Sequence, residues 1–253
     1  MQKVRLGIIS ALHEEQEGLA EAMHSPATLT HGMRDYLQGQ IAGIDAVCVL
    51  SRIGKVAAAM TATSLVEKFG VTHILFTGVA GSGDPGVHVG DIVVAESLVQ
   101  YDMDASPLFP QFEVPLTGLS HFLTDVQLTQ QVQAAARSFL DDDFDKVIDA
   151  GERSAFKLQA PRVHRGLIAS GDQFIKQAAR IRSIGEALPG LLAVEMEGAA
   201  VAQVCFELGI PFAVVRTISD NANEAAAHDF MRFVKSVASR YACHIVTRVC
   251  RAL

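Results

Sequence analysis

The strongest constraint on the fold of this chain is an alternation of short apolar runs with longer windows of helical periodicity. Runs typical of buried strands occupy residues 4–9, 45–50, 73–76, 91–95, 166–169 and 212–218. Windows with apolar residues at i, i+3 and i+4 lie at 55–69, 125–140, 197–208 and 224–251. This order predicts an α/β fold with a central, mostly parallel mixed sheet flanked by helices.

The size and composition of the chain favour a single domain. With 253 residues, 49% of them hydrophobic and 19% charged, it can bury one large core, and no linker interrupts residues 1–253. No apolar stretch reaches the roughly 18 to 20 residues that a membrane span requires. The N-terminus runs straight into a predicted strand, so no export signal is indicated and we expect a cytoplasmic protein.

Charge and cysteine content narrow the class of partner. A net charge of -7 without basic clusters argues against nucleic acid, because such binding normally needs Lys and Arg to neutralise phosphates. The substrate is therefore expected to be a small molecule. Cys48, Cys205, Cys243 and Cys250 have no metal-ligand spacing and are predicted to be core residues in a reducing compartment. We expect neither a metal nor a cofactor.

Two stretches show neither the apolar runs of strands nor the periodic spacing of helices. Residues 101–119 combine Pro107, Pro110 and Pro115 with aromatic side chains, and residues 141–161 are polar and charged. Both are predicted to be irregular, and the first is the better candidate for a lid.

Acidic residues fall at three places where strand ends are expected. Glu14 and Glu15, Glu195 and Glu197, and Asp220 all fall near strand ends, where open α/β sheets bind their ligands. Within each pair, only one side chain is expected to face the site. The alternative is that these carboxylates are solvated residues at helix N-termini, where the helix dipole favours them.

A glycine-rich segment, GVAGSG at 78–83, follows the predicted strand that ends at Thr77. It matches neither the dinucleotide fingerprint nor the P-loop, because Asp84-Pro85-Gly86 makes a turn where a helix would begin. It is either an ordinary tight turn or a backbone that faces a ligand, with Ala80 and Gly81 as the candidate binding positions.

Six segments in order along the chain carry a resemblance to a known family. They are GIISALHEE at 7–15, SRIGKVAAA at 51–59, VGDIVV at 89–94, SGDQFI at 170–175, VEME at 194–197 and RTISD at 216–220. In these segments the chain resembles the 5'-methylthioadenosine/S-adenosylhomocysteine nucleosidases of the purine nucleoside phosphorylase and uridine phosphorylase superfamily. The resemblance implies hydrolysis of the N-glycosidic bond, with release of adenine.

The resemblance also implies a catalytic role for each of four residues. Glu197 corresponds to the carboxylate that binds the ribose hydroxyls, and Asp220 to the acid that protonates N7 of the leaving purine. Glu15 corresponds to the residue that positions and deprotonates water, with Arg216 near it to stabilise charge. Ser219 is expected to orient the acid.

Other positions correspond to residues that contact the substrate. Met196 matches a methionine against the sugar, Phe174 a ring that stacks on adenine, and Ile175 a backbone that contacts the edge of the base. Ile53 and Phe230 match apolar positions around the 5'-alkylthio group, although such residues are also common in protein cores.

The loop after the first strand favours hydrolysis over phosphorolysis. Phosphorylases carry a phosphate-binding Gly-Asp-Pro-x-Arg segment there, whereas this chain has Glu14 and Glu15, which would repel phosphate. A phosphorylase, a hydrolase of another nucleoside such as futalosine, and a catalytically inactive nucleoside-binding protein are the alternatives.

Some features depart from the usual family pattern. Val79 stands where a serine near the acid is often found, Leu12 replaces a methionine near the sugar, and the 102–115 loop differs in length and sequence. These differences bear on how the acid is tuned and on which 5'-substituent is preferred. By analogy with the family, we also expect a homodimer in which this loop reaches the neighbouring site.

Overall fold

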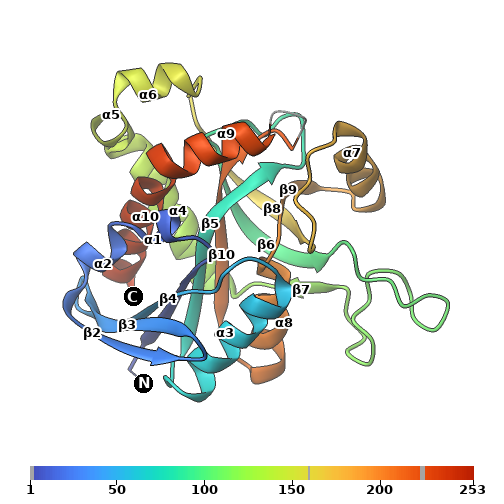
Figure 1. The fold of residues 1–253 in the computed structure, drawn as a ribbon, viewed down its shortest axis with the longest axis horizontal. Helices are drawn as coiled ribbons and strands as arrows, with labels where there is room; N and C mark the ends of the chain where they lie inside the picture. Colours follow the sequence, from blue (N-terminus) through green and yellow to red (C-terminus); the bar gives the residue numbers. More distant parts are fainter. Residues whose placement is uncertain (1–2, 159, 223–225) are drawn as a thin grey trace.

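A computed structural model describes residues 3–158, 160–222 and 226–253. One mixed sheet runs through the centre of the molecule (Figure 1), in the order β10-β6-β8-β9-β5-β1-β4-β3-β2, with β7 paired to β6. The strands are β1 (Arg5–Ser10), β2 (His24–His31), β3 (Arg34–Ile41), β4 (Ile44–Leu50), β5 (His73–Ser82), β6 (Ile92–Gln100), β7 (His121–Leu123), β8 (Val163–Ser170), β9 (Leu191–Glu195) and β10 (Phe212–Asp220).

The helices fill the connections between these strands. They are α1 (His13–Gln16), α2 (Leu19–Ala22), α3 (Lys55–Glu67), α4 (Val126–Asp142), α5 (Phe144–Val147), α6 (Ala150–Ala155), α7 (Ala178–Ala187), α8 (Gly198–Leu208), α9 (Ala226–Phe233), the π-helical η1 (Val234–Ala238) and α10 (Ser239–Ala252). The predicted helix at 224–251 begins with residues that lie outside the described part of the chain. Within the described residues, no helix is both long and apolar enough to cross a membrane.

The centre of the sheet is parallel. β4, β1, β5 and β10 run side by side in the same direction, with Ile8 opposite Leu75 and Val214 opposite Phe76. β10 also pairs antiparallel with β6, and β5 pairs antiparallel with β9. Since β6, β8 and β9 are joined as parallel neighbours, five strands close into a ring around one end of the sheet. The predicted α/β class is confirmed, and the parallel strands carry the site.

Helices cover both faces of this sheet (Figure 1). On one face α4 and α10 pack together, and Phe139 and Tyr241 meet Val215 of β10 in the core. On the other face α3 and α8 pack together and bury Leu65 and Val201. All nine residues of β10 are buried, which explains why it begins with a continuous apolar run from Phe212 to Val215 instead of an alternating pattern. Burial of each large apolar side chain contributes roughly 1.5 to 3 kcal/mol.

Several parts of the fold were not predicted. The β2–β3 hairpin was missed because β2 is polar and exposed along most of its length; its turn at Gly32-Met33 has positive φ at both residues. β9 and α7 were also missed. The segment 141–161 is not irregular as predicted, because it forms α5 and α6; Asp149 and Glu152 build a capping box at the start of α6.

Most of the glycine-rich segment forms a strand and not a tight turn. Gly78 to Ser82 continue β5, and only Gly83 follows it. Residues 101–119 contain no regular element beyond the bridge between Val114 and Leu119, and they extend away from the body of the molecule (Figure 1).

Candidate active site

A cavity opens at the carboxyl ends of the parallel strands, where the strand-end rule places a ligand. Segments that follow β1, β4, β8 and β9 line it, together with the ends of β5 and β10 and a residue of α9. The lining residues are Ala11, Leu12, Glu15, Ile53, Val79, Ala80, Gly81, Gln173, Phe174, Ile175, Val194, Glu195, Met196, Glu197, Asp220 and Phe230. Of the residues predicted for the site, only Arg216 and Ser219 do not line this cavity.

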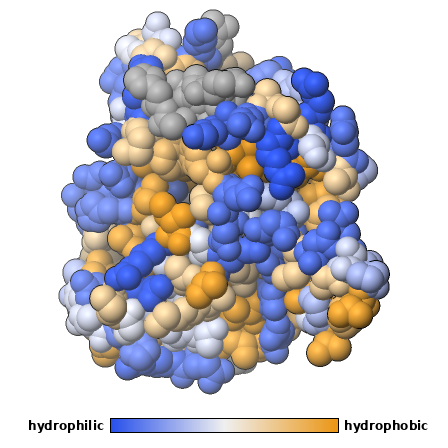
Figure 2. Space-filling model, turned by 45° about the vertical axis from the view of Figure 1, so that its right-hand side comes forward, coloured by the Kyte–Doolittle hydropathy of each residue, from blue (hydrophilic) through white to orange (hydrophobic). Residues whose placement is uncertain are grey.

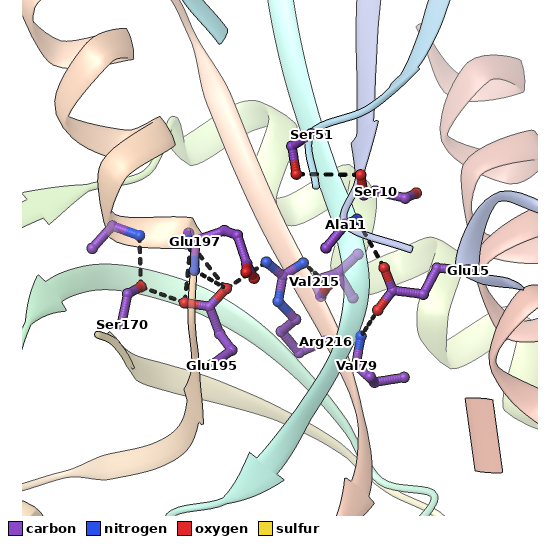
Figure 3. A network of polar contacts seen from close by, with 12 residues as sticks. Ser10, Ala11, Glu15, Ser51, Val79, Ser170, Glu195, Glu197, Val215 and Arg216 are labelled. Atoms are coloured by element: carbon purple, nitrogen blue, oxygen red, sulfur yellow. Dashed lines mark hydrogen bonds and ion pairs between the residues drawn. The ribbon is translucent and has the colours of Figure 1, made fainter. Parts of the chain in front are cut away.

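Glu15 is buried at the base of the cavity in the short helix α1. Its Oε2 accepts hydrogen bonds from the amides of Ala11 at 2.8 Å and Leu12 at 2.9 Å, and its Oε1 accepts one from Val79 at 3.0 Å. Figure 3 shows the contacts with Ala11 and Val79. Burial raises the pKa of Glu15, while the charge of Arg216 and the three amides oppose that rise. Glu14 does not line the cavity, so one member of the pair faces it, as the pattern predicted.

Arg216 lies behind the cavity wall and is 1% exposed. Its Nη2 pairs with Glu195 Oε2 at 2.6 Å, and its guanidinium lies 3.9 Å from the ring centre of Phe76. A side chain at Gly78 would place its Cβ 2.9 Å from Glu15 Oε1 and 3.2 Å from Arg216 Nη1. The glycine therefore lets this cation lie close to two carboxylates, between which it stands in Figure 3.

Glu195 is a structural carboxylate to which the sequence analysis gave no role of its own. Glu195 and Glu197 both line the cavity, so the expectation that only one of this pair faces it is wrong. Glu195 accepts hydrogen bonds from the amides of Glu197 at 3.2 Å and Gly198 at 2.8 Å, and from the hydroxyl of Ser170. It thereby holds the N-terminus of α8, whose dipole favours a negative charge there. The sequence feature that could have indicated this role is the position of Glu195 just before the predicted start of a helix at Glu197.

Glu197 has fewer partners than Glu195, although it is equally buried. Its Oε1 accepts a hydrogen bond from the amide of Gly54 at 2.8 Å. Burial, and then the charge of Glu195, raise the pKa of Glu197 to about 8. The cavity therefore contains a carboxyl group that can gain or lose a proton near neutral pH.

The Gly54 amide is held in place by charged neighbours. The Lys55 amide donates to Asp172 Oδ1 at 2.8 Å, and Lys55 Nζ pairs with Asp102 at 2.6 Å. Asp102 also accepts from the amide of Asp172 at 2.9 Å. These contacts join the start of α3 to the loop after β8, and sequence reasoning did not find them.

Asp220 is 2% exposed at the end of β10. Its Oδ2 accepts a hydrogen bond from the Ser219 hydroxyl at 2.8 Å, and its Oδ1 accepts one from the amide of Ala222 at 2.8 Å. A Cβ at Gly81 would come within 3.1 Å of Oδ1. Ser219 thus contacts the carboxyl group that it was expected to orient.

The outer part of the cavity is apolar and accessible. Ile53 is 55% exposed and Phe174 42% exposed, so neither is a core residue. The rings of Phe174 and Phe230 meet edge to face, with their centres 5.6 Å apart. Phe230 also packs against the core beneath α9. Gln173, a polar residue at this rim, was not predicted, since nothing in its spacing marks it.

Within the described residues, no cluster of three or more His, Cys, Asp or Glu side chains has the arrangement of a metal site. The carboxylates of the cavity instead contact backbone amides, hydroxyls and Arg216. This arrangement can supply an acid, a base and a hydrogen-bond acceptor around one bound molecule.

Comparison with known proteins places the chain in a family. Residues 5–251 match the model of the phosphorylase superfamily. The 5'-methylthioadenosine/S-adenosylhomocysteine nucleosidase of Shewanella halifaxensis is 33% identical over 243 residues, which is 96% of this chain and 97% of that protein. The enzyme of the same name from Shewanella frigidimarina is 35% identical over 231 residues, covering 91% and 92% of the two chains.

Solved structures of similar proteins also match this chain over nearly its whole length. The Neisseria meningitidis nucleosidase of this name, in complex with methylthio-immucillin-A, has a TM-score of 0.87 and 31% identity, covering 98% of this chain and 99% of that one. A structure described as the futalosine hydrolase of Helicobacter pylori has a TM-score of 0.83 and 31% identity, covering 97% of both chains. The chain belongs to the phosphorylase superfamily and, within it, to the 5'-methylthioadenosine/S-adenosylhomocysteine nucleosidases.

Proposed function

We propose that this protein hydrolyses the N-glycosidic bond of 5'-methylthioadenosine and S-adenosylhomocysteine, and also that of 5'-deoxyadenosine, releasing adenine and the 5'-substituted ribose. The observation that carries the proposal is the position of Glu15. It lies buried at the base of a cavity that Glu197 and Asp220 also line. The proposed substrates are those in the names of the relatives, and the proposed chemistry follows from the three carboxylates.

Breaking this bond needs three separate contributions. Positive charge builds on the ribose as the bond lengthens, the purine leaves with the bonding electrons, and water must attack the sugar carbon. In the proposed reaction Asp220 donates a proton to N7 of the purine, Glu197 binds the ribose hydroxyls, and Glu15 accepts a proton from water. Arg216 stays behind the wall, balances the charges of Glu15 and Glu195, and does not touch the substrate.

The apolar rim would receive the rest of the nucleoside. Phe174 stacks on adenine, Ile175 contacts the base edge through its backbone, and Met196 lies against the sugar. Ile53 and Phe230 surround the 5'-alkylthio group, for which exposed apolar surface is the physical requirement. Ala80 and Gly81 bring backbone close to the base at the end of β5.

Water is favoured over phosphate as the nucleophile. Glu15 already occupies three amide donors that an anion could otherwise use, and an ionised carboxylate repels phosphate. Because burial raises the pKa of Glu15, its carboxylate is a stronger base than an exposed one.

A product assay tests this function. The protein would be mixed separately with 5'-methylthioadenosine, S-adenosylhomocysteine, 5'-deoxyadenosine, futalosine, adenosine and inosine, each with and without phosphate, and base release followed by chromatography. We expect adenine from the first three, at rates that phosphate does not increase. A strict requirement for phosphate would contradict the proposal.

Futalosine hydrolysis is the second candidate, because one structural neighbour carries that name. Protonation of N7 by Asp220 suits a 6-oxo purine as well as a 6-amino purine, so the base end of the cavity does not separate the two. In the same assay, a kcat/KM for futalosine well above that for 5'-methylthioadenosine would select this alternative.

We further propose a cytoplasmic homodimer. No residue of the 101–119 loop lines the cavity of its own chain, yet the loop exposes Leu108 and Leu116 by 84% and 92%. Apolar side chains also lie in separate patches across the face shown in Figure 2. A loop that carries exposed leucines away from its own body is suited to contact a second copy. Light scattering in solution tests this, and a monomer at working concentration would contradict it.

A further inference from the structure

The end of β10, which carries the proposed acid Asp220, is irregular. β10 follows β5 in register as far as Ile218, but between Ile218 and Asp220 it has one residue more than β5. A shift of this kind is a β-bulge, which turns the next side chain to a new direction and is common beside active sites. The contacts that hold the bulge therefore decide where the carboxyl group of Asp220 points.

On the other side of β10, a turn at residues 88–91 holds Ile218. The amide of Ile218 donates to the Asp91 carbonyl at 2.8 Å, and its carbonyl accepts from the amide of Gly90 at 2.8 Å. The turn is closed by a bond from the Asp91 amide to the His88 carbonyl at 2.9 Å, and the φ of 89° at Gly90 favours glycine there. Both backbone polar groups of Ile218, two residues before the acid, are thus bonded to this turn.

The side chain of Asp91 holds the turn together. It is buried, and its Oδ1 accepts from the amide of Arg162 at 2.8 Å while its Oδ2 accepts from the amide of His88 at 3.0 Å. The Nε2 atom of His164, in β8, lies 2.8 Å from the same Oδ2. Because the oxygens of a carboxylate only accept, this ring nitrogen carries the proton. Asp91 therefore closes the turn and ties it to β8.

Asp91 has little around it to balance a buried negative charge. In the described part of the chain its one ion-pair partner is His164, whose side chain is 22% exposed. The buried hydroxyl of Tyr241, in α10, has no hydrogen-bond partner among the described residues, and burial, followed by the charge of Asp91, raises the pKa of Tyr241. A buried carboxylate that loses one of its few donors is costly to keep in place, so loss of His164 should disturb the turn.

We propose that Asp91 and His164 are positioning residues for the acid: they fix the turn at 88–91, the turn fixes Ile218, and the bulge then directs Asp220 into the cavity. The inference rests on the proposed nucleosidase function and adds to it two residues that do not line the cavity. It also gives the segment at 89–94, which carries part of the family resemblance, a role in the reaction.

The first test separates kcat from KM for 5'-methylthioadenosine. We expect His164→Ala to lower kcat about tenfold and Asp91→Asn about 10²-fold, with little change in KM, because a misplaced catalytic group weakens the transition state and not the binding of substrate. His164→Gln keeps a donor near the position of Nε2 and should restore most of kcat. An unchanged kcat in the first two variants, or no rescue by His164→Gln, would overturn the proposal.

Arg165 and Glu96 provide a matched control. They form an ion pair at 2.9 Å between β8 and β6, the same two elements that meet near His164, but farther along β6 from the turn. Arg165→Gln should leave kcat for 5'-methylthioadenosine unchanged. A loss as large as that of His164→Ala would show that any contact between these strands has the same effect, which would contradict a specific role for Asp91 and His164.

A substrate that needs no acid shows which step the pair serves. 4-Nitrophenyl 5-methylthioriboside presents the same sugar, but its leaving group departs as a stable anion without protonation. Asp220→Asn calibrates this probe, because it should lose adenine release and keep nitrophenolate release. Asp91→Asn and His164→Ala should follow the same pattern. An equal loss with both substrates would mean that the pair supports only the fold, and the proposal would fail.

The outcomes separate this inference from the function on which it rests. If the wild type releases no adenine from 5'-methylthioadenosine or S-adenosylhomocysteine, the proposed function fails. If Asp220→Asn is as active as the wild type, the acid is misassigned and its positioning residues fall with it. If Asp220 is needed while the Asp91 and His164 variants keep their kcat, only the inference fails. Where Asp91→Asn does not fold or the probe is not cleaved, His164→Ala and His164→Gln decide with 5'-methylthioadenosine.

Discussion

The floor and the rim of the cavity are built in opposite ways. On the floor, Glu15, Glu195 and Arg216 are buried and held by backbone amides or by each other. At the rim, Ile53 and Phe174 are about half exposed, and the Phe174 ring meets the Phe230 ring edge to face. The proposed base and its charged neighbours are thus held by several polar contacts, while the side chains proposed to contact the apolar part of the substrate are open to solvent.

The floor itself contains a second contrast between Glu195 and Glu197. Two residues apart and similarly buried, they differ in their partners: Glu195 has an arginine, a hydroxyl and the start of α8, whereas Glu197 has the Gly54 amide. One carboxylate is satisfied by the protein, and the other is left for a ligand.

The largest expected effect is on catalysis at the floor. Asp220→Asn removes the proposed proton donor but keeps the size of the side chain and its contact with Ser219. We expect kcat to fall by about 10² to 10⁴, the usual contribution of a positioned acid, with a normal circular dichroism spectrum. Adenine release measures this, and a rate within a few fold of the wild type would remove Asp220 from the mechanism.

Removal of the Glu195 carboxylate should lower the stability of the protein. Glu195→Ala leaves Arg216 buried without its partner and α8 without its N-terminal acceptor. We expect the free energy of unfolding in urea to fall by about 3 to 5 kcal/mol. A loss below about 1 kcal/mol, within the range of an ordinary surface substitution, would show that the ion pair is not needed to hold the floor together.

The raised pKa of Glu197 should make the stability of the protein depend on pH. Since the pKa of Glu197 rises from 4.5 to about 8 on folding, the folded state holds a proton that the unfolded state has lost between these values. Wild-type stability therefore falls as pH rises through that window, and Glu197→Gln removes this contribution. We expect the Tm of the variant to exceed that of the wild type near pH 8 and to approach it near pH 5. A difference that does not change with pH would contradict the assignment.

The smallest effect is expected at the rim. Phe174→Leu keeps apolar volume but removes the ring proposed to stack on adenine. A stacking contact is worth about 0.5 to 1.5 kcal/mol, so KM should rise by no more than about tenfold while kcat changes little. A loss of kcat as large as that of Asp220→Asn would erase the distinction between rim and floor.

The sequence predicted the carboxylates at the floor of the cavity better than the residues that hold them in place. Glu15 and Asp220 could be found because each follows a predicted strand, and the carboxyl ends of parallel strands meet at one edge. Glu197 was found through the VEME segment that resembles the nucleosidases. The role of Glu195 was missed because its partner Arg216 is distant in sequence and meets it only when β9 and β10 are in place. The turn at Gly32-Met33 was missed because the flanking strand β2 is polar.

The glycine-rich segment shows a further limit of sequence patterns. The glycines at 78–83 were expected to form either a tight turn or a backbone that faces a ligand. The structure places Gly78 and Gly81 inside β5, where Glu15, Arg216 and Asp220 leave little room for a side chain. Such close approaches are set by tertiary packing, and local sequence does not reveal them.

The most direct test of the account is the identity of the sugar product in excess phosphate. The wild type would be incubated with 5'-methylthioadenosine and phosphate, and the product mass determined. If Glu15 activates water in place of a bound phosphate, the product is free 5-methylthioribose. A product that is mainly 5-methylthioribose 1-phosphate would contradict the central claim.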